Sequence, residues 1–96
     1  MPTYLVVHRA PSYYQGSPGA MKAWNTWFGQ LGSHLVDRGN PVFSRSVLGE
    51  GPATSVLGGY TLLEAADLAA ATRLAEGCPL LADGGGVEVG ELTPIN

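Results

Sequence analysis

Two stretches of helical periodicity, each flanked by short apolar runs, constrain the fold of this chain most strongly. The first apolar run covers residues 3–8 and has the length and the Val, Leu and Tyr content of a β-strand. Further strands are predicted at residues 41–48, 58–63 and 86–92. The 96 residues therefore predict the order strand, helix, strand, strand, helix, strand.

The first helix is predicted to begin at Ser17-Pro18, with the serine as N-cap and the proline as first helical residue. One apolar stripe follows at helical spacing: Met21, Trp24, Phe28, Leu31 and Leu35. Gly39 and Pro41 are expected to end this helix. Asp67 is the predicted N-cap of the second helix, which ends at EGCP.

This order predicts an α+β fold. Two right-handed crossovers within one sheet give the split βαβ, ferredoxin-like arrangement, with an antiparallel sheet in the order 4-1-3-2 and both helices on one face. We expect one domain over residues 1–96. The segments YLVV and GYTLL carry large apolar groups on both faces, although a half-exposed sheet should alternate. We therefore expect a second copy to cover the free face, which makes a homodimer.

Two longer stretches resemble one known family. The stretch GGYTLLEAADLAAATRLAEGCPLLADGGGVEVGEL resembles the second half of YCII-related proteins, in which a strand ending in glutamate precedes a helix, a Cys-Pro stop, a glycine turn and a final VEV strand. AWNTWFGQLGSHLVDRGNP is similar to the first helix of that family and its glycine exit. The resemblance covers nearly the whole chain and is most specific over residues 58–92. It implies a dimeric α+β barrel, in which two four-stranded sheets close on each other.

The resemblance also bears on two polar positions. Some YCII-related proteins have a histidine early in the first helix and an aspartate near its end. Matched without gaps, Asp37 takes the place of the aspartate, whereas Asn25 takes the place of the histidine. If that pair is catalytic in the family, this chain has only half of it. Asp37 is thus a candidate substrate-binding residue, and the alternative is solvated surface.

The charge pattern and the single cysteine argue against several classes of protein. The net charge is −3 and the five basic residues are scattered, which disfavours a nucleic-acid partner. Cys78 is the only cysteine, so no internal disulfide can form, and the histidines lack metal-binding spacing. We expect no metal and no cofactor. The N-terminal residues show no export or membrane-spanning segment, so a cytoplasmic protein that does not associate with a membrane is expected.

His8 is the most suggestive residue for chemistry because it ends an apolar strand and ionises near neutral pH. In the predicted sheet the first strand lies between the third and fourth, whose beginnings hold Tyr60 and Glu88. Side chains opposite each other in antiparallel strands share a face. We therefore expect His8, Tyr60 and Glu88 to form a polar corner, with His8 moving a proton, Glu88 orienting the ring and Tyr60 binding a substrate oxygen. The alternative is a structural polar cluster at the barrel mouth or dimer seam.

Other side chains have weaker functional interpretations. Trp27, at the edge of the helical stripe, is expected to line a pocket, whereas Trp24 is expected in the core. Arg45 is a candidate for binding a carboxylate, with a solvated edge residue as the alternative. His34 is expected at the boundary between core and water. Cys78 follows a helix C-terminus, which opposes a thiolate, so we expect it in the core.

Two functions remain open from the sequence. One is a cofactor-free enzyme that binds a small organic metabolite and transfers a proton through His8, in an isomerisation or elimination. The other is a non-catalytic dimeric binding or accessory module. An enzyme needs His8 open to a cavity, whereas a structural role allows the ring to be closed off and fully paired.

Overall fold

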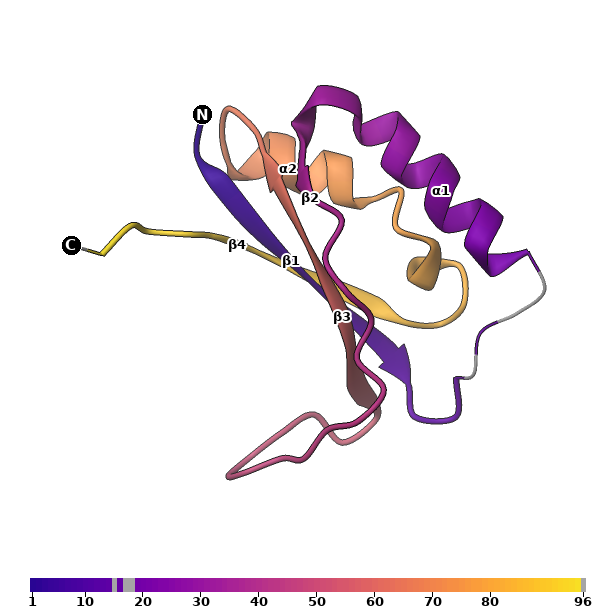
Figure 1. Ribbon diagram of the computed structural model, residues 1–96. Coiled ribbons are helices and arrows are strands. Elements are labelled where there is room, and N and C mark those ends of the chain that lie inside the picture. The colour runs from indigo at the N-terminus through magenta and orange to yellow at the C-terminus, as the bar shows by residue number, and fades with distance from the viewer. Residues whose placement is uncertain (15, 17–18, 96) are drawn as a thin grey trace.

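The computed structural model describes residues 1–14, 16 and 19–95. It shows one sheet with both helices on the same side (Figure 1). The strands and helices are β1 (Thr3–Pro11), α1 (Ala20–Leu31), β2 (Leu35–Asp37), β3 (Ser55–Glu64), α2 (Leu68–Ala75) and β4 (Gly86–Glu91). Two short 3-10 helices, Gly32–His34 and Pro79–Leu81, follow α1 and α2.

The strand order is β2-β3-β1-β4, and β1 pairs antiparallel with both β3 and β4. This is the predicted order 4-1-3-2 read from the other edge, so the α+β ferredoxin-like prediction is confirmed. The two long central strands, β1 and β3, make the most extensive pairing and carry the residues that position the site described below.

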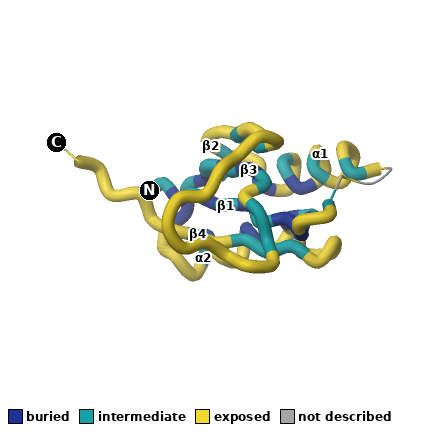
Figure 2. Tube along the Cα trace, turned by 90° about the horizontal axis from the view of Figure 1, so that it is seen from below, coloured by how far each residue is buried: buried dark blue, intermediate teal, exposed yellow. Residues whose placement is uncertain are grey.

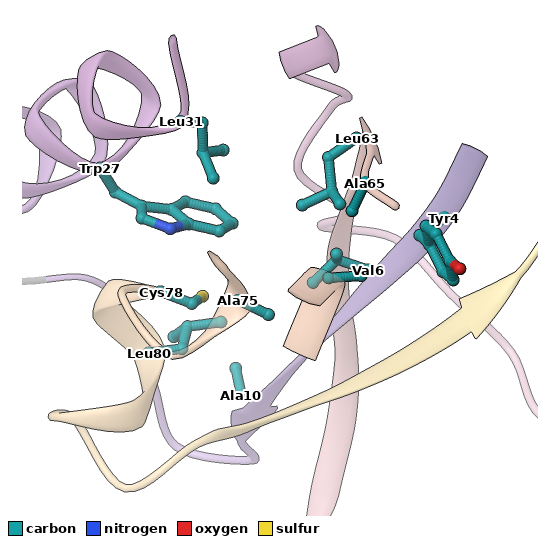
Figure 3. Close-up of a cluster of buried hydrophobic side chains, with 11 residues drawn as sticks. Tyr4, Val6, Ala10, Trp27, Leu31, Leu63, Ala65, Ala75, Cys78 and Leu80 are labelled. Carbon is teal, nitrogen blue, oxygen red and sulfur yellow. The ribbon is translucent and has the colours of Figure 1, made fainter. Parts of the chain in front are cut away.

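The core lies between the sheet and the helices, and β1 supplies alternate residues to it. Tyr4 and Val6 are fully buried on this face, with Leu63 of β3 beside them. Trp27 and Leu31 of α1 close the core from above (Figure 3). Further buried members come from α2 and from the turn after it: Ala71, Ala75, Cys78 and Leu80.

The start of α2 matches its prediction in detail. The residues predicted to start α1 lie outside the described part of the chain. Asp67 has extended backbone geometry, and its side chain accepts a hydrogen bond from the backbone N–H of Ala70 at 2.8 Å. The predicted N-cap of α1, Ser17, and Pro18 both lie outside the described residues. Cys78 is buried, as expected.

The end of α1 differs from the prediction. The helix ends at Leu31, and Gly32 follows with a φ of 55°. Leu35 fits the helical spacing of the apolar stripe, but it lies in β2 and pairs with Leu63. Because Gly29 and Gly32 both lower helix propensity in this stretch, the chain leaves the helix a turn early. Gly39 does adopt a positive φ, 73°, but it follows β2 rather than the helix.

The second strand was also predicted in the wrong place. Residues 41–48 form no strand apart from one isolated bridge between Pro41 and Gly59. Their large side chains are not packed, since Phe43 is 87% exposed and Leu48 93% exposed. Residues 43–54 instead form an exposed loop (Figure 2). The edge strand is the much shorter β2, which borders β3.

The sheet face that the helices do not cover is apolar in its centre. Leu5 and Leu62 are paired across β1 and β3, and Val7 and Tyr60 form the next pair along. All four side chains are half-buried although neither α1 nor α2 lies over them. The expectation that both faces carry large apolar groups is therefore met by the strands themselves.

Candidate functional site

His8 lies on the helix-facing side of β1, in a nearly closed position. It is opposite Gly59 of β3 and Val87 of β4. The residue is only 5% exposed, and its ring centroid lies 4.9 Å from that of Trp24 and 6.0 Å from that of Trp27. Strand β1 therefore carries a titratable side chain into the aromatic layer between sheet and helix.

The Nε2 edge of the imidazole is oriented by a buried threonine. Oγ1 of Thr61 lies 3.1 Å from Nε2 of His8 and also donates a hydrogen bond to the backbone carbonyl of Arg38 at 3.1 Å. A hydroxyl has one proton to donate. Since a carbonyl can only accept, the Thr61 proton goes to Arg38, and Thr61 must accept from Nε2. His8 thus carries its proton on Nε2, and Nδ1 is left as a free base.

Burial keeps this ring neutral at physiological pH. Removal from water lowers the pKa of His8 to about 4, because a charged ring would lose its hydration without gaining a carboxylate partner. The neutral tautomer with the proton on Nε2 is therefore the state in which the site meets a ligand near pH 7.

The chain makes room on the Nδ1 side with two glycines. The pairing of β1 with β3 shifts register between His8 and Arg9, opposite Gly58-Gly59, which is a β-bulge. A Cβ atom on Gly59 would lie 3.4 Å from Nδ1 of His8 and 2.9 Å from the carbonyl oxygen of Asn40. Glycine at this position therefore lets the segment around Asn40 and Pro41 approach the ring closely.

An open cavity of about 740 Å³ adjoins His8 between β1, β3, α1 and the segment 38–45. Its aromatic lining residues are Tyr14, Trp24, Phe28, Phe43 and Tyr60. Asn25, Arg38 and Arg45 supply polar groups. Nδ1 of His8 has no hydrogen-bond partner in the described part of the chain, and no fully buried side-chain nitrogen there lacks one, so Nδ1 is not fully buried, and His8 is one of the residues that line the cavity.

The polar corner predicted around His8 is not formed as expected. Tyr60 and Glu88 both pair with Val7, one residue before His8, and therefore belong to the opposite face of the sheet. Glu88 is exposed there and does not border the cavity. Tyr60 reaches the cavity rim, where its hydroxyl accepts a hydrogen bond from Asn40 at 3.3 Å. Thr61 replaces Glu88 as the residue that orients the ring.

Trp24, expected in the core, borders the cavity beside His8, and Trp27 is buried but borders a separate hollow between α1 and residues 77–83. Trp27 is 2% exposed, and its indole N–H donates to the backbone carbonyl of Leu74 at 3.0 Å, so it links α1 to α2 in the core. Trp24 lines the cavity beside His8. Trp27 thus lines a pocket as predicted, but Trp24 is the tryptophan in the lining of the cavity beside His8.

The remaining predicted residues occupy separate places. Arg45 borders the cavity, and its guanidinium donates to the carbonyl of Val42 at 3.3 Å. Asp37 is exposed, does not border the cavity, and accepts from the N–H of Gly39 at 2.8 Å. His34 is half-buried with Nδ1 2.9 Å from the carbonyl of Glu64. Burial raises the pKa of the Cys78 thiol to about 11, which opposes formation of a thiolate.

The described residues offer no ready metal centre. No three His, Cys, Asp or Glu side chains come together among residues 1–14, 16 and 19–95. Neither helix within those ranges has the length and apolar character needed to cross a membrane.

Comparison with protein families matches residues 19–96 to the YCII-related domain. The chain belongs to the YCII-related family. No curated protein matches the sequence. In this YCII-related chain Asn25, which was expected to take the place of a histidine, borders the cavity and accepts a hydrogen bond from Arg38 at 3.0 Å. The Asp37 carboxylate accepts its one described side-chain hydrogen bond from Gly39 and does not border the cavity, so the two positions have different surroundings.

Sequence reasoning missed Thr61 and Arg38, and each had a signal. Thr61 alternates along β3 with the buried Leu63 and pairs with Val6, which places it on the helix side, and the Gly58-Gly59 pair is the typical signal of the bulge next to His8. Arg38 precedes Gly39, whose positive φ of 73° and close approach to the backbone of Tyr60 fold the segment back over the sheet. No local pattern indicates that its side chain would reach Phe28.

Proposed function

We propose that this YCII-related protein binds a small organic molecule in the cavity beside His8 and transfers a proton through Nδ1 of that residue. The observation that supports the proposal is the neutral, oriented imidazole whose free nitrogen opens to an aromatic-walled cavity. A base in this setting suits proton removal next to an activating group, as in an isomerisation or elimination.

The hydrogen-bond pattern assigns a direction to the proton transfer. Thr61 accepts from Nε2, so this nitrogen keeps its proton and can share the positive charge when Nδ1 accepts another. The ring is held between Thr61 and the indole of Trp24, 4.9 Å away by centroids. Rotation of the imidazole would break the Thr61 hydrogen bond, which favours one productive orientation.

A non-catalytic binding module is the second candidate. His8 is 5% exposed, and its contacts with Thr61 and Trp24 are those of a packed structural residue. In this case the cavity would bind a ligand through Trp24, Phe28 and the polar rim without any transfer of protons.

For either function we propose a homodimer formed through the sheet face opposite the helices. Leu5, Val7, Tyr60 and Leu62 provide an apolar centre on that face. The His8 cavity lies mainly on the helix side, and the two surfaces meet at Tyr60, which borders both. Pairing of the free faces would remove apolar side chains from water in a chain too short to do so alone.

Exchange of carbon-bound hydrogen for deuterium tests the proposal, because it detects proton removal whatever product the reaction forms. A panel of small carbonyl compounds and acids in D2O is followed by proton NMR, and we expect catalysed exchange for at least one. His8→Gln should abolish the exchange while retaining binding. His34→Gln, which changes the histidine outside the cavity, is the matched control and should retain both. Binding without exchange for every compound would favour the binding module.

A further inference from the structure

The charge around the cavity is opposite in sign to that of the whole protein. The chain has a net charge of −3, with eight acidic and five basic residues. Two of the basic residues, Arg38 and Arg45, border the cavity, and its described lining contains no Asp or Glu. A local cationic rim on an acidic protein attracts an anion to this one place.

Arg38 is held in the cavity by neutral partners. Its Nη2 donates to the side-chain oxygen of Asn25 at 3.0 Å, and its Cζ lies 4.8 Å from the ring centroid of Phe28. The first contact uses one of five N–H groups and the second none. The guanidinium is therefore positioned and aligned by α1, while most of its donors remain available to a ligand.

The same residue is connected to the proton-transfer group through its backbone. The Arg38 carbonyl accepts the hydrogen bond from Thr61, and Thr61 in turn accepts from His8. The backbone of Arg38 and the ring of His8 are thus linked through Thr61 in one chain of hydrogen bonds. Phe28, which contacts the guanidinium, and Trp24, 5.8 Å from it by ring centroids, both border the cavity and offer apolar surface to the body of a ligand.

We infer that the molecule bound beside His8 carries a carboxylate, which Arg38 binds through its free N–H groups while a planar or aromatic body packs on Trp24 and Phe28. This inference rests on the proposed function and names its class of ligand. The fork of a guanidinium matches the two oxygens of a carboxylate, and a bidentate pair is stronger than a neutral hydrogen bond. Arg45, at the rim, adds a second positive charge.

A bound carboxylate also suits the behaviour of His8. The ring is neutral in the empty site because burial lowers its pKa. A negative charge placed nearby favours the charged ring and raises the pKa again. The anionic ligand would thus raise the pKa of His8 toward the working pH, and a pKa near that pH favours efficient proton transfer.

The test compares benzoate with benzamide, which has the same ring and nearly the same shape but no charge. Binding is followed by two-dimensional NMR at low ionic strength, with the indole N–H signal of Trp24 as the local probe. We expect benzoate to bind at least about tenfold more tightly than benzamide, since a charge-assisted pair contributes roughly 1.5–3 kcal/mol. Arg38→Gln should abolish this preference by weakening the binding of benzoate to about that of benzamide.

Arg73→Gln is the matched control, because it removes the same charge from α2 outside the cavity. It should retain the preference for benzoate. Equal affinities of the wild-type protein for the two compounds would overturn the carboxylate inference while leaving the cavity as a binding site. An equal loss of preference in Arg38→Gln and Arg73→Gln would also overturn it, because net charge alone would then explain the effect. Binding of neither compound at the Trp24 signal would overturn the proposed binding site and this inference together.

Discussion

Acidification should destabilise this protein through His8 in particular. The pKa of the folded-state ring is lowered to about 4 by burial, whereas an unfolded histidine titrates near 6.5. Between these two pH values the unfolded chain binds a proton that the folded protein does not. Stability contributed by the neutral ring is therefore present above about pH 6.5 and is lost as the pH falls toward 4.

The magnitude follows from the two pKa values. Their difference corresponds to about 3 kcal/mol when the pH is below both, and to about 2 kcal/mol between pH 7 and pH 4.5. For a domain of this size, that change shifts the urea midpoint by roughly 1–2 M. The loss is a large fraction of the 5–15 kcal/mol that stabilises a typical domain.

The assay is urea unfolding at pH 7 and pH 4.5, followed by circular dichroism, for the wild-type protein and His8→Gln. Glutamine can donate its amide proton to Thr61 as Nε2 does, but it does not ionise. Carboxylates and His34 contribute equally to both proteins, so they cancel when the two pH dependences are subtracted. We expect the wild-type protein to lose about 2 kcal/mol more than the variant. Equal losses would refute a buried neutral His8.

Three further substitutions, two of them paired with a control variant, test other parts of the structure. Thr61→Val should cost about 1–3 kcal/mol of stability, because the Arg38 carbonyl and the His8 N–H both lose a buried partner. The control Thr72→Val, at an exposed hydroxyl on α2, should cost much less. Similar losses of stability for the two variants in thermal unfolding would contradict the account. Cys78→Ala should cost about 1 kcal/mol from a small void and leave ligand binding unchanged, whereas loss of binding in a folded variant would show that Cys78 is functional. Light scattering should give about 20 kDa for the wild-type protein, twice the mass of the 10.0 kDa chain. Leu62→Glu should give the mass of the single chain, whereas the control Leu68→Glu, at an exposed position of α2, should remain dimeric. A wild-type monomer would contradict the proposed dimer.

The strongly periodic parts of the fold could be predicted from the sequence because each has one consistent local solution. Asp67 has an N-capping side chain directly before a helical stripe, and α2 begins there. The central strands follow from apolar runs bounded by turn residues, and the crossover rule then determines the sheet order. The family resemblance pointed to the same arrangement.

The segment between α1 and β3 could not be predicted, since its residues fit two patterns. Leu35 continues the helical spacing and is also a good strand residue, so only tertiary pairing with Leu63 decides. Phe43 and Val47 look like strand residues, yet they lie in an exposed loop. In the candidate site, the placement of His8 facing a pocket was predictable, but its partner was not, because a difference of one residue in the register of β3 decides whether Tyr60 or Thr61 shares the face of His8.

The protonation state of the His8 ring nitrogens tests the central claim most directly. Long-range proton–nitrogen NMR on the wild-type protein at pH 7 distinguishes a protonated from a bare ring nitrogen and follows both on acidification. We predict that His8 carries its proton on Nε2, that Nδ1 is bare, and that this state persists down to about pH 5. A proton on Nδ1, or a ring that becomes charged near pH 6.5, would contradict the account of a neutral base oriented by Thr61.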